Sequence, residues 1–155
     1  MEFIIFLSKL DKEILDLLIN ANYIVDENKI ECLFNKEIKG LHNFEKNKII
    51  ICTENAKRKT NYRNKKQYPN KENYKTEFAI RKALRHEATH AIQKCNNNKT
   101  VGEIKDLENK LHQNKKRALE FSTSNFSGTY AKEVEAYFLE DKPKKVKRMI
   151  KKYCL

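Results

Sequence analysis

The sequence contains no tryptophan, only three glycines and only two prolines. Because glycine and proline mark most tight turns and hairpins, their scarcity argues against a fold built from many short strands. Long apolar runs are missing as well, and the opening run, residues 3–7, has only five residues. A membrane-spanning helix needs about 20 apolar residues and the core of a signal peptide about 7–15. These absences predict a soluble, cytoplasmic and mainly helical protein without a transmembrane segment.

The chain has 155 residues, which is enough for one domain with its own hydrophobic core. Its net charge is +12, and basic residues concentrate in the segments 57–75 and 142–155. We expect a single domain over residues 1–141, with 57–75 as a basic loop insertion and 142–155 as a basic C-terminal tail or helix. A basic tail attracts anionic partners such as nucleic acid or a membrane surface, and a merely solvated surface is the alternative.

Apolar residues repeat with helical spacing over residues 9–21, where Ser8 or Asp11 can cap the helix. The segment 40–52 is typical of a hairpin, because a polar turn separates two apolar stretches. A longer helix is expected over residues 75–96, since one continuous apolar stripe runs along it.

Three further helices are expected in the C-terminal part. Thr100 and Glu103 have the spacing of a capping box, which predicts a helix after residue 100. A shorter helix follows from residue 130, and Pro143 suits the first turn of a terminal helix. The predicted fold class is therefore α+β and mainly helical, with a small antiparallel sheet packed on the helix over residues 75–96.

The strongest functional signal is His86-Glu87-x-x-His90 within that helix. Two histidines four residues apart lie about 5–6 Å from each other on one helix face, so both imidazoles can reach one ion. In zinc peptidases with this motif, the glutamate takes a proton from the attacking water. A surface helix with two exposed histidines is the structural alternative. The apolar stripe on the far side of the helix favours a metal site, because a buried helix holds its ligands still.

A catalytic zinc site needs a third protein ligand. One class of zinc peptidases takes a histidine six residues after the second one, but Asn96 occupies that position. A glutamate from a later helix is then expected, and Glu133 and Glu135 flank the apolar face of the helix from residue 130 about equally. Ala136 favours Glu133, because a small residue about one turn away permits close helix packing. Glu135 is the alternative, and His112 is a more remote candidate.

These features resemble the zincin-like metallopeptidases of the gluzincin type, and most closely the mitochondrial inner-membrane ATP-synthase-processing metalloprotease family. The matching features, over about a third of the chain, are a strand ending at Cys52 with Asn55 after it, the motif from His86 to Ala91 followed by Cys95, and Glu133 with Ala136. The resemblance implies Zn²⁺ held by His86, His90 and Glu133, with Glu87 as the catalytic base.

The resemblance implies a zinc-dependent metallopeptidase that hydrolyses a protein or peptide substrate through a zinc-activated water. In such folds a peptide can align along the strand 49–52 as an added strand. Tyr130, Tyr137 or His112 could donate a hydrogen bond to the oxyanion. The alternative from another class is a basic nucleic-acid-binding or scaffold protein with a non-catalytic metal site.

The four cysteines are widely spaced, without a Cys-x-x-Cys pair, and reduced thiols are expected in a cytosolic protein. Because the strand and the site helix are neighbours in folds of the resembling kind, Cys52 is expected near Cys95. Two buried thiols are expected there, with a disulfide between them as the alternative.

Overall fold

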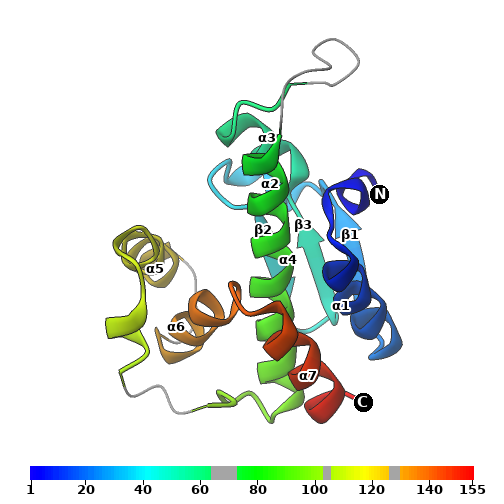
Figure 1. Cartoon of the computed structure of the whole chain (residues 1–155), viewed down its shortest axis with the longest axis vertical. Coiled ribbons are helices and arrows are strands. Elements are labelled where there is room, and N and C mark those ends of the chain that lie inside the picture. Colours follow the sequence, from blue (N-terminus) through cyan, green and yellow to red (C-terminus); the bar gives the residue numbers. More distant parts are fainter. Residues whose placement is uncertain (64–72, 103–105, 126–129) are drawn as a thin grey trace.

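The structure is a computed structural model of the chain, and it describes residues 1–63, 73–102, 106–125 and 130–155. In chain order, with η for a 3-10 helix, the elements are η1 (Glu2–Phe6), α1 (Lys9–Asn20), β1 (Ile24–Glu27), α2 (Glu31–Phe34), β2 (Gly40–Asn43), β3 (Lys48–Ile51), α3 (Thr53–Lys59), α4 (Tyr74–Cys95), η2 (Glu108–Lys110), α5 (Gln113–Asn125), α6 (Tyr130–Leu139) and α7 (Pro143–Tyr153). The long helix α4 contacts the sheet, α1, α6 and α7 (Figure 1). This confirms the predicted mainly helical α+β class.

The sheet has three strands in the order β1-β3-β2, so β3 is central. β2 and β3 pair antiparallel as the predicted hairpin, with Leu41 opposite Ile50. The expectation of a wholly antiparallel sheet is wrong, because β1 pairs with the other side of β3 in parallel, with Val25 opposite Ile49. The three isoleucines of β3 are almost completely buried, which fits a strand covered on both faces.

Local signals place α1 and α4 as predicted. Ser8 caps α1 and forms a reciprocal capping box with Asp11, which satisfies backbone N–H groups at the helix start. The stripe of α4 that contains Ile80, Leu84 and Ala88 is fully buried in the main core. The core therefore fixes one face of α4 and leaves the neighbouring face, which carries the two histidines, directed toward β2 and α6.

The basic C-terminal segment forms the helix α7, one of the two alternatives expected for residues 142–155. Pro143 stands in its first turn, as predicted, because proline needs no hydrogen-bonded N–H there. Val146 and Ile150 are fully buried in the same core as α1 and α4, so α7 covers that core. Among the described residues, no helix is both long and apolar enough to cross a membrane.

Two predicted elements differ from the structure. No described helix begins at Thr100: residues 101–102 bend, residue 103 lies outside the described part, and α5 begins only at Gln113. The capping pattern failed because Val101 and Gly102 instead donate their N–H groups to a glutamate of α6. The expected basic loop 57–75 is also shorter than predicted, since α3 extends to Lys59 and α4 begins at Tyr74, while residues 64–72 lie outside the described part.

The prediction for the cysteines is wrong, because both expected partners are bonded elsewhere. Cys52 forms a disulfide with Cys32, and Cys95 forms one with Cys154. Side chains of a strand alternate between its two faces. Cys52 follows β3 on the face of Ile50, which packs with Cys32 away from α4, so it cannot meet Cys95. The first disulfide fastens α2 to the end of β3, and the second fastens the end of α4 to α7.

Candidate metal centre

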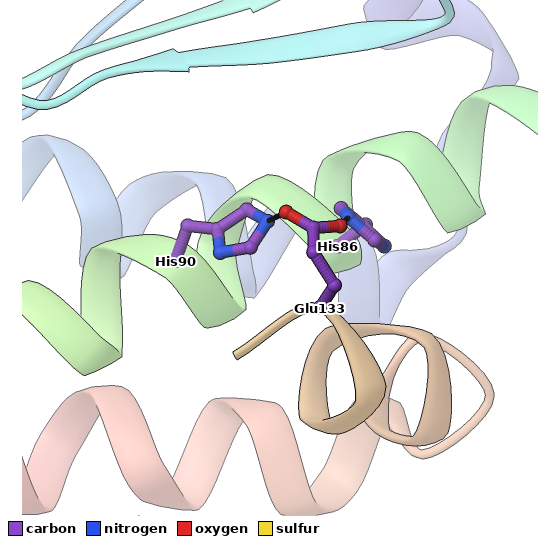
Figure 2. A group of neighbouring side chains, drawn as sticks. All are labelled: His86, His90 and Glu133. Carbon is purple, nitrogen blue, oxygen red and sulfur yellow. Dashed lines mark ion pairs between the residues drawn. The ribbon is translucent and has the colours of Figure 1, made fainter. Parts of the chain in front are cut away.

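Helices α4 and α6 pack together and bring His86, His90 and Glu133 to one point. Figure 2 shows the Glu133 carboxylate rising from α6 between the two imidazoles, with one oxygen directed at each ring. Oε2 lies 3.4 Å from Nε2 of His86, and Oε1 lies 3.3 Å from Nε2 of His90. One ligand atom from each of the three residues lies within 4.8 Å of the others.

These separations fit a single ion. Zinc bonds of about 2.0–2.2 Å place neighbouring atoms of a tetrahedral site about 3.3–3.6 Å apart. Each Glu133 oxygen lies at such a distance from the histidine nitrogen that it faces. Two histidines and one glutamate are the protein ligands of a known class of catalytic zinc sites, in which the fourth position is left for water. The donor set and its spacing therefore suit Zn²⁺.

A carboxylate behind His86 selects the tautomer that a metal ligand needs. Oε2 of Glu140 lies 3.4 Å from Nδ1 of His86, so the proton of a neutral ring belongs on Nδ1 and Nε2 keeps its lone pair. Glu140 is buried, and its other oxygen forms ion pairs with Lys115 at 2.9 Å and Lys82 at 3.5 Å. Glu140 thus links the site helix to α5 through charges.

His90 is oriented in the same way by Gln93. The side-chain nitrogen of Gln93 donates to the Lys132 carbonyl and to Oε2 of Glu135, both at 3.0 Å. Since both of these partners are acceptors, the amide oxygen of Gln93 must face Nδ1 of His90, at 2.9 Å. Nδ1 therefore donates, and Nε2 of His90 is left with its lone pair toward Glu133.

The alternative ligand, Glu135, has a different role in the structure. Its carboxylate accepts hydrogen bonds from the backbone N–H groups of Val101 and Gly102 and from Gln93. It is almost completely buried, and it stands outside the group that could hold a metal ion. Glu135 therefore braces Gln93, whereas Glu133 faces the histidines.

Glu87 lies in contact with strand β2. A Cβ atom at Gly40 would lie 2.8 Å from both Cγ and Oε1 of Glu87, so only glycine leaves room for this side chain. Glu87 is 6% exposed, and burial raises the pKa of its carboxyl, while the two histidines of the site oppose that rise. A raised pKa brings the carboxyl closer to the operating range of a general base.

Strand β2 contacts the site helix at a second point, His42. Residues two apart on a strand share a face, so His42 faces the same way as Gly40. The ring of His42 stacks on that of His90 with 6.4 Å between centroids. Burial lowers the pKa of His42 to about 3, and its Nε2 has no hydrogen-bond partner among the described residues. β2 thus covers both the base and one ligand.

The charges at the centre favour a cation. Although burial alone would lower the pKa of His86, contacts with Glu133 and Glu140 raise it well above its ordinary value. Burial would also raise the pKa of Glu133, but the two histidines hold it well below the usual carboxyl range. The protein field therefore stabilises positive charge where the three side chains meet.

Of the three expected oxyanion donors, only Tyr137 lies at the cleft. Its ring is 4.5 Å from that of His86, and its hydroxyl contacts Ser122 Oγ at 2.8 Å. Tyr130 is 46% exposed, and His112 is exposed at the start of α5. Neither of them belongs to the cleft lining or to the group that could hold a metal.

The cleft over the centre has a volume of about 1010 Å³ and is lined by β2 and the segment before it, by α4, and by α5 and α6. Such a volume accommodates several residues of a peptide. The strand 49–52, expected to border the cleft, is paired on both edges, so it cannot accept an added strand. β1 and β2 are the two edge strands, and of these β2 lines the cleft.

Several residues of the site were not found from the sequence. Glu140, Gln93 and His42 carry no motif, although Gln93 stands three residues after His90 on the same helix face. Asn55, one of the matching features of the resemblance, supports the site only indirectly. Its side-chain nitrogen donates to three backbone carbonyls between residues 32 and 38, which fixes the segment leading into β2.

Comparison with known proteins places the chain in a family without assigning an activity. No curated protein and no solved structure matches it. One family model matches residues 3–155, which is almost the whole chain. The chain therefore belongs to the family described as Domain of unknown function (DUF8637).

Proposed function

We propose that this protein is a zinc-dependent metallopeptidase. The observation that carries the proposal is the convergence of His86, His90 and Glu133 within 4.8 Å, with Glu87 on the same helix. Hydrolytic zinc sites combine such a ligand set with a glutamate that follows the first histidine. Both histidines are held with Nε2 free to bind, which a pair of surface histidines would not require.

Each residue of the site has its own role in the proposed hydrolysis. Bound zinc lowers the pKa of water and polarises a scissile carbonyl. Glu87 takes the proton of the attacking water and delivers it to the leaving amine. Glu140 and Gln93 hold the two imidazoles in position. Tyr137 is our candidate for the donor to the oxyanion, because its ring already packs against His86.

The substrate is a peptide in extended conformation. β2 has one edge without a strand partner in the described sheet, and that strand lies over Glu87 and His90. An extended peptide can add to such an edge through main-chain hydrogen bonds. Added there, its backbone would run past the base and the ligands, which is the geometry that hydrolysis of an internal peptide bond needs.

The metal itself is the first test. Protein loaded with zinc and then desalted is expected to hold one Zn²⁺ per chain by elemental mass spectrometry. His86→Ala and Glu133→Gln are expected to lose it, because each removes a ligand. Glu135→Gln is expected to retain zinc with about 10–100-fold weaker affinity, since Glu135 braces Gln93 behind His90 and binds the backbone at Val101 without being a ligand.

His112→Ala is the matched control, because this histidine is exposed and lies outside the group that could hold the metal. Zinc that is lost equally in His112→Ala would contradict the ligand set. Wild type without zinc after reconstitution would end the metallopeptidase proposal as a whole. If Glu133→Gln binds one zinc per chain and Glu135→Gln binds none, the third ligand is Glu135 and not Glu133.

The alternative function, a basic nucleic-acid-binding or scaffold protein with a non-catalytic metal site, is favoured by one feature of α7. Lys144, Arg148 and Lys151 are exposed and make no ion pair with the described part of the chain. If they bind an anionic partner, changing all three to Glu should lower the salt concentration that elutes the protein from DNA-cellulose, because fewer phosphates are neutralised.

The matched control changes three exposed lysines elsewhere, and these are Lys9, Lys36 and Lys46. If the eluting salt concentration falls equally in both triple variants, retention depends on net charge alone and not on α7. The same pair tested on anionic lipid vesicles separates a membrane surface from nucleic acid. Binding specific to α7 is compatible with the peptidase, since α7 packs on the side of α4 opposite to α5 (Figure 1).

A cytoplasmic location stays a prediction from the sequence. Thiols in the cytosol are kept reduced, and stable disulfides are typical of oxidising compartments. The pairs Cys32–Cys52 and Cys95–Cys154 therefore favour an oxidising compartment as the place of action.

A further inference from the structure

One end of the cleft carries basic side chains that the metal centre does not use. Four lysines line the cleft in the neighbourhood of Glu140, and they are Lys39, Lys59, Lys82 and Lys115. Three of them form ion pairs with acidic side chains of the protein. Lys39 has no carboxylate oxygen within ion-pair distance in the part of the chain that the structure describes. Its charge is therefore available to a ligand.

Lys39 stands next to the catalytic end of the cleft. It directly precedes Gly40, against which the Glu87 side chain packs. One residue of extended chain spans about 3.3 Å, so the Lys39 backbone adjoins the residue that contacts the proposed base, and Lys39 lines the same cleft as Glu87. Its backbone is fixed there, because the Lys39 carbonyl accepts a hydrogen bond from Cys52 at 2.9 Å.

The surroundings of Lys39 favour an incoming anion. The side chain is half-buried, and burial, together with the like charge of Lys59, lowers the pKa of its ammonium. Glu140 and Glu37 oppose that lowering, but only from beyond ion-pair distance. A partly desolvated cation without a direct ion-pair partner is unfavourable, and a carboxylate brought by a ligand relieves that cost. Arg117 of α5 and Lys132 of α6 also line the cleft and extend its basic character.

We propose that the cleft selects peptides with an acidic side chain within about two residues of the scissile bond, and that the Lys39 ammonium binds that carboxylate. This inference rests on the proposed function, because the selected position is defined by the bond that the centre hydrolyses. Arg117 and Lys132 then favour further acidic residues along the peptide. The substrate class is an extended acidic peptide.

The test uses a peptide library made from a digested proteome and the zinc-loaded full chain. Cleaved peptides are expected to carry Asp or Glu within two residues of the new termini, enriched by at least about tenfold over the uncleaved library, as one charged hydrogen bond allows. Lys39→Glu is expected to abolish this enrichment and to favour Lys or Arg at the same position. Lys36→Glu, a charge reversal three residues away on an exposed side chain outside the cleft lining, is expected to keep it.

Cleavage without acidic enrichment, or enrichment unchanged in Lys39→Glu, would overturn the inference and leave the peptidase intact. If no peptide is cleaved, the proposed function fails. The role of Lys39 is then tested by measuring the binding of peptides to the cleft. The probes are a fluorescein-labelled nonapeptide with Glu at its three central positions and its counterpart with Lys there. Zinc alone can attract the acidic probe, so the deciding result is the difference between Glu87→Gln and Glu87→Gln with Lys39→Glu. Equal affinity of these two proteins for the acidic probe would refute the role of Lys39.

Discussion

Glu87→Gln should leave the zinc in place and lower peptide hydrolysis by about 10²–10⁴-fold, the range that general acid–base catalysis contributes. Glutamine has the shape of glutamate, so it keeps the contact with Gly40 but cannot accept the proton of the attacking water. The measurement is cleavage of a proteome-derived peptide library by equal amounts of zinc-loaded protein. Elemental analysis of the same samples gives the zinc content.

Glu77→Gln is the matched control, since it makes the same change near the start of α4, where Glu77 pairs with Arg81. Hydrolysis in Glu77→Gln should equal that of the wild type. Undiminished hydrolysis in Glu87→Gln would remove the catalytic role of this glutamate. Loss of zinc together with activity would make Glu87 a structural support of the centre, because a base that only moves a proton is not needed to hold the ion.

The second large effect is expected on stability, at the buried ion pair between α1 and α4. Asp11 is fully buried and accepts two hydrogen bonds from Arg85, at 2.6 Å and 3.0 Å. Asp11→Ala should lower the free energy of unfolding by about 3–5 kcal/mol, because it leaves the guanidinium buried without its counter-charge. Urea unfolding followed by circular dichroism, with the disulfides intact, measures this loss.

Asp16→Ala serves as the control, because Asp16 is exposed on the same helix, and a change of no more than about 0.5 kcal/mol is expected. The double variant with Asp11→Leu and Arg85→Met should be more stable than Asp11→Ala, since neither charge is then left buried alone. A double variant as unstable as Asp11→Ala would show that the cost arises from lost packing or from the lost cap of α1.

This ion pair also concerns the site. Arg85 directly precedes His86, and its guanidinium donates a further hydrogen bond to the Glu140 carbonyl at 3.2 Å. Arg85 therefore joins α1, the site helix and the end of α6 behind the metal ligands. A loss of Asp11 is expected to loosen the support of His86 as well as the fold.

The parts of the fold that were predicted correctly depend on local signals. Ser8 and Asp11 interact within one helical turn, and the stripe of α4 lies within one helix. A short stretch of sequence is therefore enough to predict each of these elements. The parallel pairing of β1 with β3 was missed because it joins segments separated by α2 and β2, and nothing in β1 alone identifies its partner.

The candidate site shows the same division. The pair His86 and His90 follows from helical spacing, but Glu133 and Glu135 are nearly equivalent on a helical wheel. The difference between them comes from the segment at Val101, whose backbone N–H groups bind Glu135. The sequence of α6 alone contains no information about this contact. The cysteine pairing was open to prediction in part, because alternation along β3 directs Cys52 away from α4.

The disulfide between Cys95 and Cys154 also changes how the ligands are tethered. Its bridge closes a segment whose ends are 59 residues apart, and Glu133 lies within that ring, whereas both histidines lie just outside it. The shortest covalent path from His90 to Glu133 therefore runs through the sulfur atoms and back along α7. A shorter tether raises the effective concentration of one group near another, even in an unfolded chain. The oxidised unfolded chain is thus a better chelator than the reduced one, and any zinc it binds reduces the net stabilisation that the metal gives to the fold.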